Sequence, residues 1–416
     1  MSAQLKNKYK EICRIKRSKF APFFFLYYII HKVVEDVFIR IICIFYRVDD
    51  HQIVLRSFPD YSDNGQALAE YLVDNGYTKK YKVYYDVTDL SKFRNNSNDL
   101  KFISCETELG LYRFRWLKVI YTAKYLLFTH RPIIIRKRAR KDQVLVNLFH
   151  GNGYKDRSMQ ESCGRAPYDY SIVSGNLFVK PMAYFWNIEE SRVFPIGFPR
   201  YNWLMIRDKT AETFLNSYKQ DTDSKVVMWM PTFRVDKRGV HNESSAIIQF
   251  PLIESLDDWM GLDKLCCDNN IILLIKLHPF QKNYAIPFGS FTNIKEITNE
   301  DFERVGVPMY KLIALTDALI SDYSSVAIDY LLVDRPIAFA LQDFNAYRDT
   351  RGFVFEDPRV YMPGHHLYSF QDLTRFLNNV SKGNDLYQME RNKMRSNAVC
   401  QSDDYCKGLL EKFDII

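Results

Sequence analysis

The 416-residue sequence lacks the features that mark small disulfide-rich, zinc-binding or membrane-spanning proteins. Its eight cysteines include no C-x-x-C pair, which argues against a zinc module and suits a reducing compartment. In the N-terminal segment, the longest charge-free run before His31 covers Phe20–Ile30, shorter than the roughly 18 residues that a membrane-spanning helix needs. No small-residue cleavage site follows this run, so a signal peptide is not predicted.

Glycine-rich nucleotide-binding motifs are also absent. Only 16 residues are glycine, and the sequence contains neither a G-x-x-x-x-G-K-[ST] loop nor a G-x-G-x-x-G turn after its first predicted strand. It has no internal repeat, and its 47% hydrophobic content excludes a disordered or low-complexity protein. The length predicts two or three domains.

The positive charge is concentrated in two short runs. Of the net charge of +7, residues 1–20 carry +6 and residues 131–142 carry +5, which leaves −4 for the rest of the chain. A nucleic-acid-binding protein usually spreads basic charge over a face, so no nucleic-acid partner is predicted. Anionic lipid or a polyphosphate chain is the favoured partner.

Residues 1–48 are predicted to form a basic, amphipathic arm. From Ile29 onward the polar residues recur at helical spacing, and apolar residues occupy the rest of the cylinder; the polar positions are Lys32, Glu35, Asp36 and Arg40. Two interpretations stay open: a helix packed on a domain core, or a peripheral anchor on an anionic membrane surface.

The rest of the chain alternates short β-branched or aromatic runs with helix-length segments. The first series of expected strands is 52–58, 81–87, 124–129, 143–149, 170–174 and 192–197, and the second is 225–230, 271–277, 318–322 and 336–340. This alternation predicts an α/β protein with parallel sheets. We expect two Rossmann-like domains facing a cleft, residues 49–207 and 208–395, followed by a helical tail, residues 396–416.

A candidate general base follows the strand expected at 143–149. His150 stands at its carboxyl end, followed by a turn with Gly151 and by Lys155. An imidazole with an unperturbed pKa near 6.5 suits proton transfer, and glycine lets a substrate approach the backbone. A purely structural role for a histidine in such a turn stays open.

Polar residues also follow successive strands of the second series. They are Thr232 and Arg234, then Lys276 and His278, then Asp322, Ser324 and Ser325, with Asp329 in the helix beyond. Because active sites of open α/β sheets lie at the carboxyl ends of the strands, these residues predict one diphosphate site. Taken singly, each also has a structural interpretation, such as a surface arginine or a helix cap.

Together these segments resemble the CDP-glycerol glycerophosphotransferase family, which includes teichoic acid primases, polymerases and capsule polyol-phosphate transferases. The segments are His150-Gly151-x-x-x-Lys155, GFPR (197–200), PTFR (231–234), KLHP (276–279), SDYSSVAIDYLL (321–332), RP (335–336), D-F-x-x-Y (343–347) and RG (351–352). The match spans about residues 50–380.

The resemblance implies a GT-B-like fold, monotopic membrane association and transfer of a polyol phosphate from a CDP-activated donor to an acceptor hydroxyl, with release of CMP. It implies that His150 is the base and that Arg234, His278, Ser324 and Ser325 hold the donor diphosphate. Supporting roles are expected for Gly151, Lys155, Thr232, Lys276, Asp322 and Asp329, and Asp63 and Asn64 resemble the acceptor-side segment. Residues 152–154, Asn-Gly-Tyr, depart from the Thr-Pro-Leu of many members.

The leading hypothesis is therefore transfer of a polyol phosphate, glycerol phosphate first, to a lipid-linked or polymeric polyol-phosphate or saccharide acceptor. The enzyme would work at the cytoplasmic face of the cell membrane, in teichoic acid or capsular polymer synthesis. Two alternatives stay open: a nucleotide-sugar glycosyltransferase or epimerase of GT-B fold, and a catalytically inactive membrane scaffold. No metal site is predicted, while a divalent cation beside the diphosphate, the donor polyol and the oligomeric state stay open.

Overall fold

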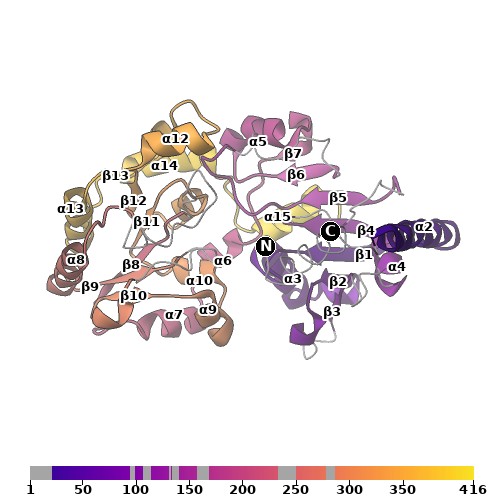
Figure 1. Cartoon of the computed structure of the whole chain (residues 1–416), viewed down its shortest axis with the longest axis horizontal. Helices are drawn as coiled ribbons and strands as arrows, with labels where there is room; N and C mark the ends of the chain where they lie inside the picture. The colour runs from indigo at the N-terminus through magenta and orange to yellow at the C-terminus, as the bar shows by residue number, and fades with distance from the viewer. Residues whose placement is uncertain are drawn as a thin grey trace. The chain divides into compact units, whose positions relative to one another are not determined.

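A computed structural model of the chain describes residues 21–93, 99–105, 114–130, 133, 140–156, 168–232, 250–277 and 286–416. Within these ranges, strands alternate with helices from Asp49 to Leu367 (Figure 1). The predicted α/β class is confirmed, with two parallel sheets.

The first sheet has seven strands in the order β3-β2-β1-β4-β5-β6-β7. Its strands are β1 (Asp49–Arg56), β2 (Lys82–Asp86), β3 (Leu100–Ile103), β4 (Ala123–Phe128), β5 (Val144–Asn147), β6 (Tyr170–Ile172) and β7 (Val193–Phe194). The β1–β2, β1–β4, β2–β3 and β6–β7 pairs are parallel. The strand order reverses direction between β1 and β4, which is where ligands of open α/β sheets usually bind.

The second sheet has six strands in the order β10-β9-β8-β11-β12-β13. Its strands are β8 (Lys225–Trp229), β9 (Ile271–Ile275), β10 (Ile294–Glu296), β11 (Ala318–Ser321), β12 (Ile337–Ala340) and β13 (His365–Leu367). All five neighbouring pairs are parallel. Here the order reverses between β8 and β11.

The described helices account for most of the remaining ordered segments. They are α2 (Ala21–Phe45), α3 (Asp63–Asp74), α4 (Phe114–Thr122), α5 (Val179–Trp186), α6 (Tyr201–Met205), α7 (Lys209–Asn216), α8 (Leu256–Asp268), α9 (Asn299–Val305), α10 (Met309–Ile313), α11 (Val326–Asp329), α12 (Phe344–Arg351), α13 (Phe370–Ser381), α14 (Gln388–Ala398) and α15 (Tyr405–Lys412). The polar stretch 208–225 holds α7, because Asp208 caps it by accepting hydrogen bonds from the backbone N–H groups of Thr210 and Ala211, both at 2.9 Å.

The chain divides into two compact units. The first comprises Met1–Tyr61 and Leu72–Val146, and the second comprises Ser62–Tyr71 and Asn147–Ile416. Asp63 and Asn64, at the start of α3, therefore belong to the second unit together with His150 and the whole second sheet. The predicted domain boundaries and the predicted cleft remain proposals.

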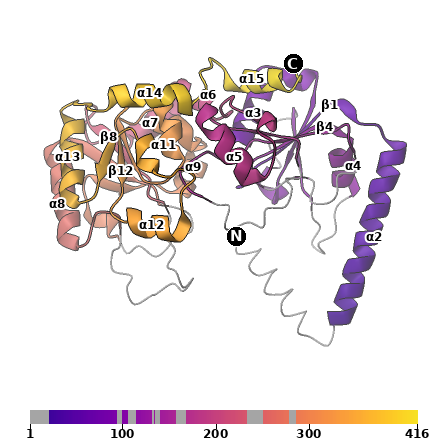
Figure 2. The same ribbon diagram turned by 90° about the horizontal axis from the view of Figure 1, so that it is seen from above.

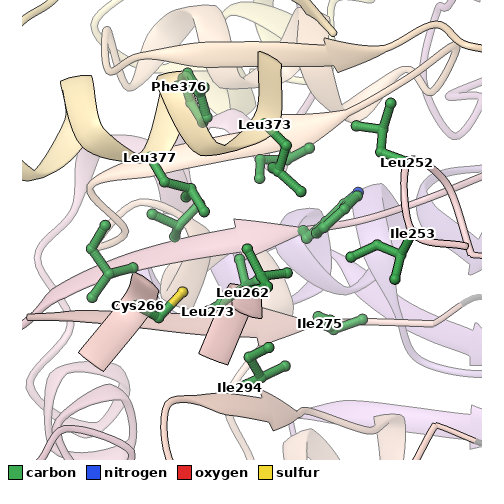
Figure 3. Close-up of a cluster of buried hydrophobic side chains, with 14 of the residues drawn as sticks. Leu252, Ile253, Leu262, Cys266, Leu273, Ile275, Ile294, Leu373, Phe376 and Leu377 are labelled. Atoms are coloured by element: carbon green, nitrogen blue, oxygen red, sulfur yellow. The ribbon is translucent and has the colours of Figure 1, made fainter. Parts of the chain in front are cut away.

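An apolar cluster fixes the second sheet from one side (Figure 3). Leu273 and Ile275 of β9 pack with side chains from α8 and α13, which include Leu262, Leu373 and Phe376. Serine N-caps set the start of both helices, since Ser255 and Ser369 each accept a hydrogen bond from the backbone N–H three residues later. The strand ends that carry the polar motifs are thus held by a dry core.

In the first unit, α2 packs against α4, as Figure 2 shows. The Phe38 and Phe114 rings meet edge to face with centroids 5.3 Å apart, and Ile39 and Ile42 are buried. Contrary to the simple amphipathic pattern, Glu35 is also buried while apolar side chains remain exposed. The exposed ones are Leu26, Ile29, Ile30, Val33, Val34, Val37, Phe38, Ile41, Ile44 and Phe45. Among the helices that the structure describes, none has the length and hydrophobicity needed to cross a membrane.

Candidate active site

The loops that follow β8 and β11 are joined by a buried carboxylate. Asp322, which is fully buried, accepts a hydrogen bond from the backbone N–H of Thr232 at 2.7 Å and another from the Thr232 hydroxyl. This bond closes the carboxyl edge of the second sheet at the point where its strand order reverses. Asp322 and Thr232 therefore hold the two loops together, while the supporting role in the reaction predicted for them stays a prediction.

Ser324 and Ser325 come next on the same loop and are half-buried. Ser325 immediately precedes α11, but its hydroxyl makes no capping bond to the helix. Within the described part of the chain, neither hydroxyl has a hydrogen-bond partner, so both stay available to a bound ligand. The two carbonyl groups, by contrast, accept bonds from the N–H groups of Ala327 and Ile328.

The turn that carries His150 is held from several sides. The Asn64 side-chain amide donates to the carbonyls of Leu148 at 3.2 Å and of Phe149 at 2.9 Å. Phe149 has a positive φ of 52°, unusual for a residue other than glycine, and its N–H donates to Asn147 Oδ1 at 3.0 Å. These bonds fix the backbone from which the half-buried His150 side chain extends.

Glycine lets this turn lie directly against Ser325. A Cβ atom on Gly151 would lie 2.6 Å from Ser325 Oγ, and one on Gly153 would lie 3.2 Å from the Ser325 backbone nitrogen. Gly151 also has a φ of 121°, which side-chain-bearing residues rarely adopt. The structure thus brings the His150 motif and the Ser324–Ser325 motif together within the second unit.

Arg200 connects the His150 turn to the helix α11, which follows Ser325. Its Nη1 donates to the His150 carbonyl at 3.0 Å and to Asp63 Oδ1 at 2.5 Å, and its Nη2 donates to Asp329 Oδ2 at 2.6 Å. Burial alone would lower the pKa of Arg200, but the Asp329 and Asp63 carboxylates outweigh burial and raise it, so the guanidinium stays charged. Sequence reasoning quoted Arg200 only within the GFPR segment and gave it no role.

Asp63, Asn64 and Asp329 are all committed to this network. Asn64 Oδ1 also accepts the Arg200 backbone N–H at 3.3 Å, and its side chain is fully buried. Asp329 further accepts the Tyr201 hydroxyl at 2.5 Å and the Tyr310 hydroxyl at 2.6 Å. The acceptor-side role predicted for Asp63 and Asn64 stays a prediction, while their bonds show that they hold the His150 turn.

The D-F-x-x-Y and R-G segments pack behind the serine pair. The Tyr323 hydroxyl donates to Asp343 Oδ1 at 3.0 Å, and its ring lies 4.1 Å from that of Tyr347. Lys155 forms an isolated antiparallel bridge with Phe353, next to Gly352. Segments far apart in the sequence are thereby joined around residues 323–325.

Lys276 directly follows β9 of the same sheet and is buried. Its ammonium donates to Asn299 Oδ1 at 2.7 Å, and burial lowers the pKa of Lys276 to about 8. Arg234 and His278, both predicted to bind the diphosphate, lie outside the described residues.

No group of three or more metal-binding side chains occurs within the described ranges. The adjacent histidines of β13 have separate surroundings: the His365 ring packs on Phe376 and Tyr387, whereas His366 Nε2 lies 3.1 Å from the Met362 carbonyl. They form no shared site.

Comparison with known proteins connects this geometry to one family. The sequence profile described as CDP-Glycerol:Poly(glycerophosphate) glycerophosphotransferase matches residues 38–406. The teichoic acid ribitol-phosphate polymerase TarL of Staphylococcus aureus is 25% identical over 343 residues, which is 78% of this chain and 55% of that protein. The teichoic acid poly(glycerol phosphate) polymerase of Bacillus spizizenii is 24% identical over 359 residues, which is 77% of this chain and 83% of that protein.

This chain spans about half the length of several of the curated relatives it matches, with 55%, 52% and 45% of three of them covered. The structure of the wall teichoic acid polymerase TagF matches with a TM-score of 0.72 at 20% identity and covers 94% of this chain and 95% of that one. The fold is therefore GT-B-like, as the sequence resemblance implies. Since the family profile extends over nearly the whole chain, the protein belongs to the CDP-glycerol:poly(glycerophosphate) glycerophosphotransferase family.

Proposed function

We propose that this protein transfers a polyol phosphate, glycerol phosphate first, from a CDP-activated donor to an acceptor hydroxyl and releases CMP. The observation that carries the proposal is the packing of the Gly151 turn on Ser325. This packing supports a site in which His150, the residue before Gly151, acts together with the Ser324 and Ser325 hydroxyls, which have no partner within the described residues. Membership of the family supplies the donor chemistry.

In the proposed reaction, His150 takes the proton from the hydroxyl of the acceptor substrate. The oxygen of that hydroxyl then attacks the polyol-bearing phosphorus of the donor. A new P–O bond forms, the bond from that phosphorus to the bridging oxygen breaks, and CMP leaves with the electron pair. Ser324 and Ser325 donate hydrogen bonds to the diphosphate oxygens as charge builds on them. Phosphoryl transfer depends mainly on such positioning and electrostatic stabilisation, so no covalent intermediate is needed.

Arg234 and His278 are proposed as further diphosphate ligands, because in the sequence they follow β8 and β9, strands of the same sheet as β11, which precedes Ser324. Thr232 and Asp322 would keep that edge closed. The acceptor is proposed to be a lipid-linked or polymeric polyol phosphate, since the names of the relatives include both primases and polymerases of glycerol phosphate and ribitol phosphate.

The deciding experiment supplies purified full-length protein with CDP-glycerol and CDP-ribitol separately, each with a polyol-phosphate primer. We expect CMP release with one donor, and growth of the primer by phosphodiester-linked units in mass spectra. A glycosidic product, or CMP release with neither donor, would refute the proposal. Calorimetric titration with CDP adds a binding test: absence of binding would favour an inactive scaffold.

We also propose that α2 places the enzyme on an anionic membrane surface at the cytoplasmic face. Ile44 and Phe45 at its end are 75% and 76% exposed, and the sequence that precedes the helix carries +6 over residues 1–20. Exposed apolar side chains beside basic charge are typical of helices that lie in the bilayer interface.

Sedimentation with lipid vesicles tests this placement. Replacing Ile44 and Phe45 together by serine should weaken binding to phosphatidylglycerol vesicles about tenfold or more, because each apolar side chain loses its transfer free energy. Met389→Ser, at a side chain that is 83% exposed on α14, is the control and should bind like the wild type. Unchanged binding of the double variant would refute the placement.

A further inference from the structure

One guanidinium joins the two halves of the candidate site. Arg200 bonds to the His150 carbonyl on one side and to Asp329 on the other. Asp329 lies on α11, the helix that starts immediately after Ser325. The distance between the His150 turn and the serine pair is therefore set partly by a side chain that belongs to neither.

We propose that Arg200 is a positioning residue of the transfer reaction, which holds the His150 turn against the first turn of α11 without contacting a substrate. This inference rests on the proposed function, because it assigns Arg200 a role only through His150 and Ser325. No other described residue bonds both to the backbone of the His150 turn and to a side chain of α11.

Burial leaves Arg200 one arrangement. Its side chain is 1% exposed and forms ion pairs with both Asp63 and Asp329. Any other rotamer would leave a buried cation and a buried carboxylate unmatched, which is strongly unfavourable. Asp329 is equally constrained, because the Tyr201 and Tyr310 hydroxyls occupy its two oxygens.

The spacing around Gly151 shows how tightly the parts fit. A Cβ atom there would lie 2.7 Å from Arg200 Nη2 as well as 2.6 Å from Ser325 Oγ. Arg200, the His150 turn and Ser325 thus meet at one point. A shift of the guanidinium must move the turn, the serine or both.

Arg391 offers a matched comparison within the same unit. Its side chain is also 1% exposed and also pairs with two carboxylates, those of Asp334 and Asp385. It lies on α14, and its ion pairs involve neither the His150 turn nor α11. Replacement of Arg391 therefore reports the cost of disturbing a buried arginine that has no link to the site.

The test compares Arg200→Lys with Arg391→Lys in the full-length protein. Lysine keeps the charge but has a single nitrogen, which cannot reach Asp63, the His150 carbonyl and Asp329 as the planar guanidinium does. The measurements are kcat and KM for CMP release, CDP affinity by calorimetry, the unfolding temperature, and the ¹³C-histidine NMR signal of the His150 ring. That signal is assigned by its loss in His150→Gln.

For Arg200→Lys we expect kcat to fall about 10- to 100-fold, because small displacements of reacting groups have effects of this size. CDP affinity should change less than about threefold, and the His150 signal should shift. Arg391→Lys should lower the unfolding temperature by a similar amount yet leave kcat and the His150 signal unchanged. If Arg200→Lys does not fold, Asp329→Asn takes its place with the same expectations.

Equal loss of kcat in the two lysine variants, or an unshifted His150 signal in Arg200→Lys, would overturn the positioning role. The proposed function fails by a different result, namely full activity of His150→Gln. In that case the NMR comparison still decides whether Arg200 positions the His150 ring.

Discussion

The two parallel sheets share a strand order at their centres and differ in what they carry where that order reverses. In the first sheet the reversal lies between β1 and β4, and Thr129 ties the two loops: its N–H donates to the Arg56 carbonyl at 3.1 Å, and its hydroxyl accepts the Phe58 N–H at 3.3 Å. In the second sheet the reversal lies between β8 and β11, where the Met230 N–H donates to the Ile320 carbonyl at 2.9 Å and a buried carboxylate, Asp322, accepts the Thr232 N–H at 2.7 Å. The same topology thus supports two different kinds of edge.

The polar side chains near the two reversals differ in how far they are available to bind a ligand. At the first reversal Asp86 is 1% exposed, receives the Trp116 indole N–H at 3.0 Å and lies 3.5 Å from Arg56. At the second, Ser324 and Ser325 are half-buried with hydroxyls that have no partner within the described residues. The topology therefore allows a ligand at either reversal, and these side chains are the reason for proposing the diphosphate site at the second one.

The largest expected effect is the loss of the His150 imidazole, which follows β5 of the first sheet. His150→Gln should lower the rate of CMP release about 10²- to 10⁴-fold, because it removes the general base while keeping a polar side chain of similar size. His365→Gln, at a histidine of β13 outside the proposed site, is the control and should retain activity. A His150 variant that releases CMP at the wild-type rate would show that the first sheet contributes no chemistry.

A smaller effect should follow at the reversal of the second sheet. Ser325→Ala removes a hydroxyl proposed to bind the charged donor, so KM for the donor should rise about tenfold, the range for a hydrogen bond to a charged group. Ser321→Ala is the matched control, because its hydroxyl is buried on β11 and has no partner within the described residues. Equal KM values for the two variants would mean that the Ser325 hydroxyl does not bind the donor, and the proposed difference between the two reversals would be lost.

The sequence predicts the central strands well but misses three of the four edge strands. Each run predicted as a strand overlaps one, but β3, β10 and β13 are not anticipated. All three lie at or next to a sheet edge, have three or four residues and include polar positions, as in Ile294–Glu296. Pairing with a neighbouring strand, rather than their own apolar pattern, stabilises them.

At the site, local motifs identify His150 and the serine pair, because each follows a strand end. Arg200 escapes such reasoning, since its partners Asp63 and Asp329 lie 137 and 129 residues away in the sequence. Asn64 is a similar case: the sequence gives it only a resemblance to the acceptor-side segment, whereas the fold buries it against the carbonyls of Leu148 and Phe149. Packing roles of this kind depend on tertiary contacts that no local pattern encodes.

The last prediction, which expects no effect on activity, tests whether the first reversal serves stability alone. Burial raises the pKa of Asp86 to about 6 from 3.8, although Arg56 and Trp116 act to lower it. Between these values the folded protein keeps a proton that the unfolded chain has lost, so stability should fall as pH rises from about 4 to 6, by roughly 3 kcal/mol in total. The side chain introduced by Asp86→Asn cannot ionise. The unfolding free energy of the variant should therefore increase relative to that of the wild type as pH rises across this window, while KM for the donor stays the same. Parallel pH curves for the two proteins would mean that Arg56 compensates the buried carboxylate fully, and a changed KM would mean that the first edge also senses the donor.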